Sequence, residues 1–151
     1  MPTPTPTPST YDYAVIRVVP RVERGEFINA GVIMSCAATG YLQARIELDE
    51  AKLLALDPAA DVAGIRAGLA AIPVICAGGA AAGALGALST RERFHWLVAP
   101  RSTSIQTSPV HTGRCDSAED QLERLMQQMV RIRDQPSPHR AAPGTQASTK
   151  D

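Results

Sequence analysis

The sequence predicts an α+β domain, in which a small antiparallel sheet is covered by helices. Over 28–36 every even-numbered residue is apolar, and the same alternation returns over 42–48. A period of two is typical of a strand with one buried face. Farther along the chain, apolar residues of 118–130 recur at intervals of three and four, which is the period of a helix that buries one side. The two periods together predict helices packed on a sheet.

Composition limits the architecture and the partners. The chain has 151 residues, no net formal charge, and 44% hydrophobic but only 4% aromatic residues, so it can bury one modest aliphatic core. Neutral charge provides no general attraction to nucleic acid or to an anionic membrane, and we expect neither as a partner. We predict one globular domain over 11–132, with disordered tails at 1–10 and 133–151 that are rich in Pro, Ser and Thr.

Cysteine usage and the apolar segments bear on the compartment. Cys36, Cys76 and Cys115 are odd in number and never form a Cys-x-x-Cys pair, which argues against a disulfide framework or a structural zinc. We therefore predict a cytoplasmic protein with no metal and no cofactor, and the N-terminal segment lacks the features of a secretory signal. The uncharged run 67–88 is long enough for a membrane span, but its glycines, alanines and single proline argue against one, and we predict a flexible Gly/Ala connection around 78–86.

The predicted sheet is built around a hairpin over 27–48. A three-residue loop, 38–40, is expected because it places even-numbered residues of both strands opposite one another on the buried face, with Gly40 free to take a positive φ. A first strand is predicted over 12–19, ended by Pro20, and an irregular strand is predicted near 103–111.

Helices are predicted near 58–71, 90–98 and 117–132, with a shorter one over 50–56. Asp57 is the expected N-cap of the 58–71 helix, and Pro73 is expected to end it. Ser89 and Glu92 have the spacing of a capping box before the 90–98 helix. Asp116 is the expected cap of the 117–132 helix, whose apolar stripe should cover the sheet.

Two groups of polar residues are candidates for function. Residue parity places Arg17, Asn29 and Arg45 on the odd-numbered face of the sheet, which is either a binding surface or a solvated face with weak ion pairs. The segment 100–114 contains Arg101, Ser102 and His111 among many hydroxyl residues. Its guanidinium and hydroxyl donors suit an anion, although such hydroxyls also commonly satisfy their own backbone.

A third set of residue types suits a thiol nucleophile. Cys115 could act with His111 as its base, but the sequence indicates neither an orienting third group nor an oxyanion hole.

Several short motifs, taken in order, resemble the bacterial domain of unknown function 3037 family. They are Tyr11-x-Tyr13, Arg17, Glu26-Phe27-x-Asn29-x-Gly31-Val32, Arg93-Phe94-x-Trp96-Leu97, Pro100-Arg101-Ser102 and His111-x-Gly113. The resemblance covers about residues 11–132 and excludes both tails. It implies a small bacterial protein without an established activity, and it transfers no catalytic residue. It also implies an accessory role beside a HipA-like kinase.

We predict a noncatalytic binding or accessory module that acts through a protein partner, because no complete nucleophile, metal or acid–base set is evident. Its candidate surface comprises Arg17, Glu26, Asn29, Arg45, Arg101, Ser102 and His111. The alternative is an enzyme or sensor that binds a phosphate-bearing small molecule or nucleic acid through an Arg/His cluster. Convergence of the arginines and the histidine in one pocket favours the alternative, and their dispersal favours the binding module.

Overall fold

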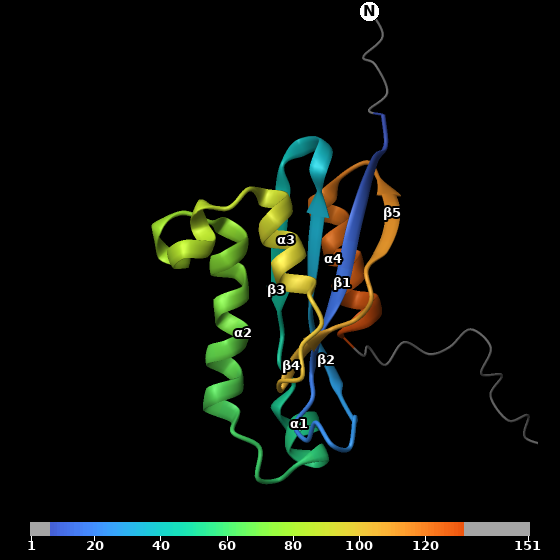
Figure 1. Ribbon diagram of the computed structural model, residues 1–151. Coiled ribbons are helices and arrows are strands. Elements are labelled where there is room, and N and C mark those ends of the chain that lie inside the picture. The colour runs from blue at the N-terminus through green and yellow to red at the C-terminus, as the bar shows by residue number, and fades with distance from the viewer. Residues whose placement is uncertain (1–6, 132–151) are drawn as a thin grey trace, which may run out of the picture.

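The computed structural model describes residues 7–131, which form an antiparallel sheet with helices on both faces (Figure 1). The strands are β1 (Ser9–Val18), β2 (Ile28–Cys36), β3 (Tyr41–Ile46), β4 (Ile105–Thr107) and β5 (His111–Cys115). The α-helices are α1 (Glu50–Leu56), α2 (Val62–Ala77), α3 (Thr90–Val98) and α4 (Ala118–Met129), and the 3-10 helices are η1 (Ala37–Thr39) and η2 (Ala80–Ala87). The predicted α+β fold is confirmed. Of the predicted tails, 1–6 and 133–151 lie outside the described residues, whereas Ser9 and Thr10 belong to β1.

Strand β1 is the centre of the sheet, whose order is β3-β2-β1-β4 with β5 also paired to β1. The irregular strand predicted near 103–111 is present at this edge of β1, but it is divided into two short strands, β4 and β5. Between them, the backbone N–H of Val15 donates to Oγ of Ser108, and the N–H of Ser108 donates to the carbonyl of Val15, both at 2.8 Å. Pro109 follows and has no N–H for the ladder, so the pairing breaks here.

The hairpin of β2 and β3 has a different register from the predicted one. Cys36 lies opposite Tyr41 and Gly31 opposite Ile46, so even-numbered residues pair with odd-numbered ones across a four-residue connection made of η1 and Gly40. Gly40 has the predicted positive φ, 68°. The parity argument failed because both faces of β2 are buried, and the apolar pattern therefore does not identify a single core face.

A β-bulge in β2 changes which residues face each layer. Ile16 lies opposite Gly31 but Arg17 lies opposite Asn29, so Ala30 is an extra residue between two pairs. As a result, Ala30 packs with the core under α2 and α3, whereas Asn29 contacts the end of α4. The bulge therefore aims the Asn29 side chain at the α4 face, beside Arg17.

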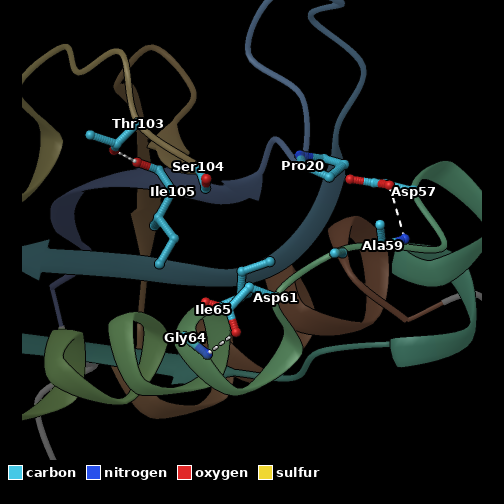
Figure 2. Close-up of a pocket in the computed structure, with 10 residues that line it drawn as sticks. Pro20, Asp57, Ala59, Asp61, Gly64, Ile65, Thr103, Ser104 and Ile105 are labelled. Atoms are coloured by element: carbon cyan, nitrogen blue, oxygen red, sulfur yellow. Dashed lines mark hydrogen bonds between the residues drawn. The ribbon is translucent and has the colours of Figure 1, made fainter.

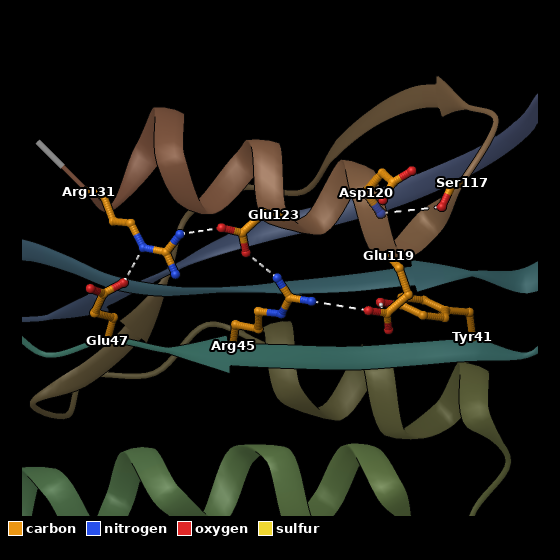
Figure 3. A network of polar contacts seen from close by, with 8 residues as sticks. All are labelled: Tyr41, Arg45, Glu47, Ser117, Glu119, Asp120, Glu123 and Arg131. Carbon is orange, nitrogen blue, oxygen red and sulfur yellow. Dashed lines mark hydrogen bonds and ion pairs between the residues drawn. The ribbon is translucent and has the colours of Figure 1, made fainter. Parts of the chain in front are cut away.

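Each face of the sheet carries its own hydrophobic core. Residues from the sheet pack against α1, α2 and α3 on one face; this core includes Ile16, Val18, Ile33, Leu53, Leu69 and Phe94. Helix α4 covers the other face; this core includes Tyr11, Val32, Met34, Cys36, Leu122, Leu125 and Met126. Figure 3 shows α4 on one side of the strands, with α2 and α3 on the other side.

Helix ends differ from the predictions at two places. Asp57 is the C-cap of α1, and Asp61 caps α2 by accepting a hydrogen bond from the N–H of Gly64. Helix α2 runs through Pro73 to Ala77, because Ile72 and Cys76 on either side of the proline are both buried in the core. For α4 the cap is Ser117 instead of Asp116, and α3 begins after Ser89 as predicted.

The segment between α2 and α3, predicted as a flexible Gly/Ala connection, forms η2 with a kink at Gly83. Within residues 7–131 no single helix has both the length and the apolar character to cross a membrane. Helices α2 and η2 meet that requirement only when taken together, and they are bent by 63°.

Candidate functional site

The residues of the predicted surface do not form one cluster. Arg17 and Asn29 are neighbours on β1 and β2, on the face that α4 covers in part. His111 lies opposite Tyr13, four residues before Arg17 on β1, which corresponds to roughly 13 Å along the strand. Arg101 contacts α3, on the opposite face of the sheet. The structure thus separates the arginines and the histidine.

Arg45 belongs to a row of alternating charges that joins β3 to α4 (Figure 3). We call this row the ion ladder; it comprises Tyr41, Glu119, Arg45, Glu123, Arg131 and Glu47. Arg45 reaches Glu119 at 3.1 Å and also contacts Glu123, which in turn contacts Arg131. Both Nη atoms of Arg45 are therefore engaged by acids of α4, and its role is to attach the helix to the sheet.

The ion ladder predicts a dependence of stability on acid. The hydrogen bond from Arg131 is the largest influence on the pKa of Glu123 and holds it below the usual value, with Arg45 acting in the same direction. A lowered folded pKa contributes stability that is present above the unfolded value of about 4.3 and is lost as pH falls through the folded value. From about pH 6 to about pH 3, the melting temperature of Glu123→Gln should fall less than that of the unsubstituted protein.

Thermal unfolding followed by circular dichroism measures this difference. The matched control is Glu23→Gln, because Glu23 is exposed and no ion pair joins it to another residue in the range 7–131. The same acid dependence in both variants would show that the ion ladder does not contribute. Added salt should narrow the gap between Glu123→Gln and the unsubstituted protein near neutral pH, since exposed charges are screened.

Arg101 stabilises the end of α3. Its Cζ lies 4.0 Å from the centroid of the Trp96 ring, and its Nη2 donates to the Trp96 carbonyl at 2.6 Å. The carbonyls of the last helical turn lack partners within the helix, so this contact is a side-chain cap. Ser102, its neighbour, is exposed.

His111, Cys115 and Glu26 occupy three further places. The His111 ring packs on Tyr13 with centroids 5.3 Å apart, at the first residue of β5, while Cys115 is its last residue. Burial raises the pKa of the Cys115 thiol, which disfavours a thiolate nucleophile. Glu26 pairs with Arg24 in the exposed loop between β1 and β2. The residue types for thiol catalysis are present, but the geometry does not bring them together.

Arg17 and Asn29 lie beyond the end of α4, on a part of the sheet that we call the polar shelf. The polar shelf comprises Arg17, Phe27, Asn29 and Gln106. Cζ of Arg17 lies 4.2 Å from the centroid of the Phe27 ring, and the Phe27 side chain is 43% exposed. Nδ2 of Asn29 donates to the carbonyl of Met129, the last residue of α4, at 2.9 Å. Gln106 belongs to β4 and pairs with Arg17 across the edge of β1 that faces away from β2.

The hydrogen bonding of Arg17 is incomplete. Its Nε and the Oδ1 of Asn29 are buried without a partner among residues 7–131, and its Nη atoms make no hydrogen bond there. The Nε of Arg93, which is also partly buried, likewise has no partner among the described residues, but the two Nη atoms of Arg93 donate to the carbonyls of Leu88 and Cys76. A buried donor without an acceptor is costly and uncommon. Arg17 is therefore the arginine of the predicted surface that has no hydrogen-bond acceptor among the described residues.

Sequence reasoning missed a pocket of about 460 Å³ beside the start of α2 (Figure 2). Asp57 and Asp61 line it from one side and Thr103 to Ile105 from the other. Oδ1 of Asp57 accepts from the N–H of Ala59 at 3.0 Å, and Asp61 caps α2, so both carboxylates already hold backbone donors. No group of three or more His, Cys, Asp or Glu side chains in the described chain is arranged to hold a metal ion.

Comparison with known protein families identifies the family of the chain. A family model described as a protein of unknown function, DUF3037, matches residues 13–130. The resemblance predicted from the sequence motifs is confirmed. No curated protein and no solved structure matches the chain.

Proposed function

We propose that this chain, which belongs to the DUF3037 family of proteins of unknown function, is a noncatalytic binding module that acts through a protein partner. One observation carries the proposal: the partly buried Arg17 stacks on the exposed ring of Phe27 and has no acceptor among the described residues. An arginine and an aromatic residue side by side on a surface are typical of the residues that dominate protein–protein binding energy.

Dispersal of the other polar residues supports the same proposal over an Arg/His catalytic cluster. Arg45 is held by two acids of α4, Arg101 caps α3, and His111 packs on Tyr13. A pocket that recognises phosphate or performs acid–base chemistry needs such groups to converge within hydrogen-bond reach of one reacting atom. The polar shelf offers a surface instead.

Capture of partners from a lysate of the native host tests the proposal. Full-length protein, Arg17→Gln and Arg114→Gln are immobilised in parallel, and bound proteins and small molecules are identified by mass spectrometry. Arg114 is the matched control because it is an exposed arginine of β5, away from the polar shelf. A HipA-like kinase is the first protein to seek.

The proposal predicts a stoichiometric protein partner that binds the unsubstituted protein and Arg114→Gln but is lost with Arg17→Gln. Circular dichroism confirms that each variant is folded. Recovery of only a nucleotide or metabolite, or equal capture by all three proteins, would overturn it.

A further inference from the structure

We infer that the polar shelf binds a carboxylate of an acidic side chain on the partner protein, through the two Nη atoms of Arg17. This inference rests on the proposed function and names the chemistry of the contact. Arginine is charged at all relevant pH values, and its planar fork matches a carboxylate with two parallel hydrogen bonds. Among the described residues no oxygen occupies that position on Arg17, although Arg45 and Arg131 each contact two carboxylates.

The fork of Arg17 is already oriented for such a contact. The Arg17 side chain is partly buried, and its Nε is buried without a partner among residues 7–131, whereas its Nη atoms are not among the buried atoms of that kind. The Phe27 ring supports one face of the guanidinium at 4.2 Å. The backbone of Arg17 is held in β1, which pairs with β2 on one edge and with β4 on the other. A side chain held in its bound geometry loses little conformational freedom on binding.

Charge favours a carboxylate over a phosphate. The polar shelf contains one cation, and the neighbouring arginines Arg24 and Arg131 are already paired with Glu26, Glu47 and Glu123. Helix α4 ends at Met129, whose carbonyl contacts Asn29, so the negative end of its dipole faces the shelf. A phosphate monoester carries roughly −1.5 to −2 charges at neutral pH. The helix end repels both anions, but it disfavours the phosphate more, because Arg17 offsets one negative charge and the phosphate carries close to two.

Exposure favours a protein side chain over a free small acid. The whole loop 21–27 is exposed, and Phe27 lies beside the guanidinium with much of its ring open to solvent. Small molecules bind tightly where a cavity encloses most of their surface. A partner protein can place the carboxylate of an acidic residue on Arg17 and an adjacent apolar side chain on Phe27. The rest of the partner's surface then adds to the buried interface area.

Nuclear magnetic resonance of the arginine Nε–Hε groups tests the contact with defined probes. Full-length protein is titrated at low salt with a blocked peptide that has glutamate between two leucines, and with matched peptides carrying glutamine or phosphoserine. We expect a saturable shift of the Arg17 signal by the glutamate peptide with a Kd on the order of 1 mM, no saturable shift by glutamine, and weaker binding of phosphoserine. Arg17→Lys keeps the charge but removes the fork and its Nε–Hε signal, so binding by the variants is followed through the backbone amide of Phe27. Arg17→Lys should bind the glutamate peptide at least about fivefold more weakly, while Arg114→Gln should bind it unchanged.

The inference is overturned if the glutamate peptide leaves the Arg17 signal unshifted, if the glutamine peptide acts equally, or if phosphoserine binds more tightly. Titration of the unsubstituted protein decides this even if a variant fails to fold. Arg17-dependent capture of a protein together with tighter phosphoserine binding would preserve the proposed function and refute the carboxylate. Binding of the glutamate peptide at Arg17 without Arg17-dependent capture would instead refute the protein partner.

Discussion

Replacing Gly31 by alanine is expected to lower the free energy of unfolding by about 3 kcal/mol, the upper part of the range for overpacking. A Cβ at this position would overlap the backbone carbonyl oxygen of Arg45 on β3 and would lie 3.0 Å from Cδ1 of Ile16. Backbone cannot rotate away as a side chain can, so the added methyl group would force β2 and β3 apart. Urea unfolding followed by circular dichroism measures the loss.

The matched control is the same substitution at Gly68 in α2. A Cβ there would meet Cδ1 of Ile105 at 2.6 Å, which is the movable end of a flexible side chain. Alanine is also the better helix former, by about 1 kcal/mol. Gly68→Ala should therefore be as stable as the unsubstituted protein or more so. Equal losses in the two variants would show that close approach of the strands is not what Gly31 provides.

Replacing Phe94 by alanine is expected to lower the free energy of unfolding by about 3–5 kcal/mol. Phe94 is 1% exposed, and from α3 it packs in the core that α1, α2 and α3 form with the sheet. Removing the ring leaves a cavity between layers that can relax only in part. Because whole domains are stable by about 5–15 kcal/mol, this variant should lose about a fifth or more of its stability.

Trp96→Ala is the control for Phe94→Ala because it removes a larger aromatic ring from the same helix. The Trp96 side chain is 40% exposed and contacts Arg101, so its loss should cost about 1 kcal/mol. Trp96 is the single tryptophan of the chain, so unfolding must be followed by circular dichroism instead of tryptophan fluorescence. Comparable losses in the two variants would contradict the burial of Phe94 as the cause.

Features set by local sequence were predictable. The apolar stripe of α4 appears in the sequence at helical spacing, and Leu122, Leu125 and Met126 are buried as it indicates. Ser89 accepts from the N–H of Glu92 and begins α3, because a cap depends only on residues within one turn. Pro73 shows the limit of local rules, since burial of Ile72 and Cys76 keeps α2 helical beyond it.

Features set by contacts between distant residues were not predictable from one sequence. The hairpin register was inferred from one buried face, but α4 covers the second face of β2 from more than eighty residues farther along the chain. Arg17, Asn29 and Arg45 do share a face, and the presence of α4 divides them between the polar shelf and the ion ladder. Gln106 is one of the polar residues of the 100–114 segment, but its position beside Arg17 was not predicted, because β4 has only three residues and no visible pattern. The sequence did contain a signal for Phe27, because it is one of only two phenylalanines in the chain and lies two residues before Asn29, so that both face the same side of an extended segment.

The position of β1 has a consequence for biosynthesis. One edge of β1 pairs with β2, the next strand of the chain. The other edge pairs with residues synthesised much later, as when Ser9 pairs with Cys115. A ribosome adds residues at about 5–20 per second. In the growing chain, β1 paired with β2 therefore has one unpaired edge for seconds before β4, β5 and α4 emerge. Partially synthesised chains must therefore be shielded from one another during translation, because an unpaired strand edge is a template for intermolecular pairing.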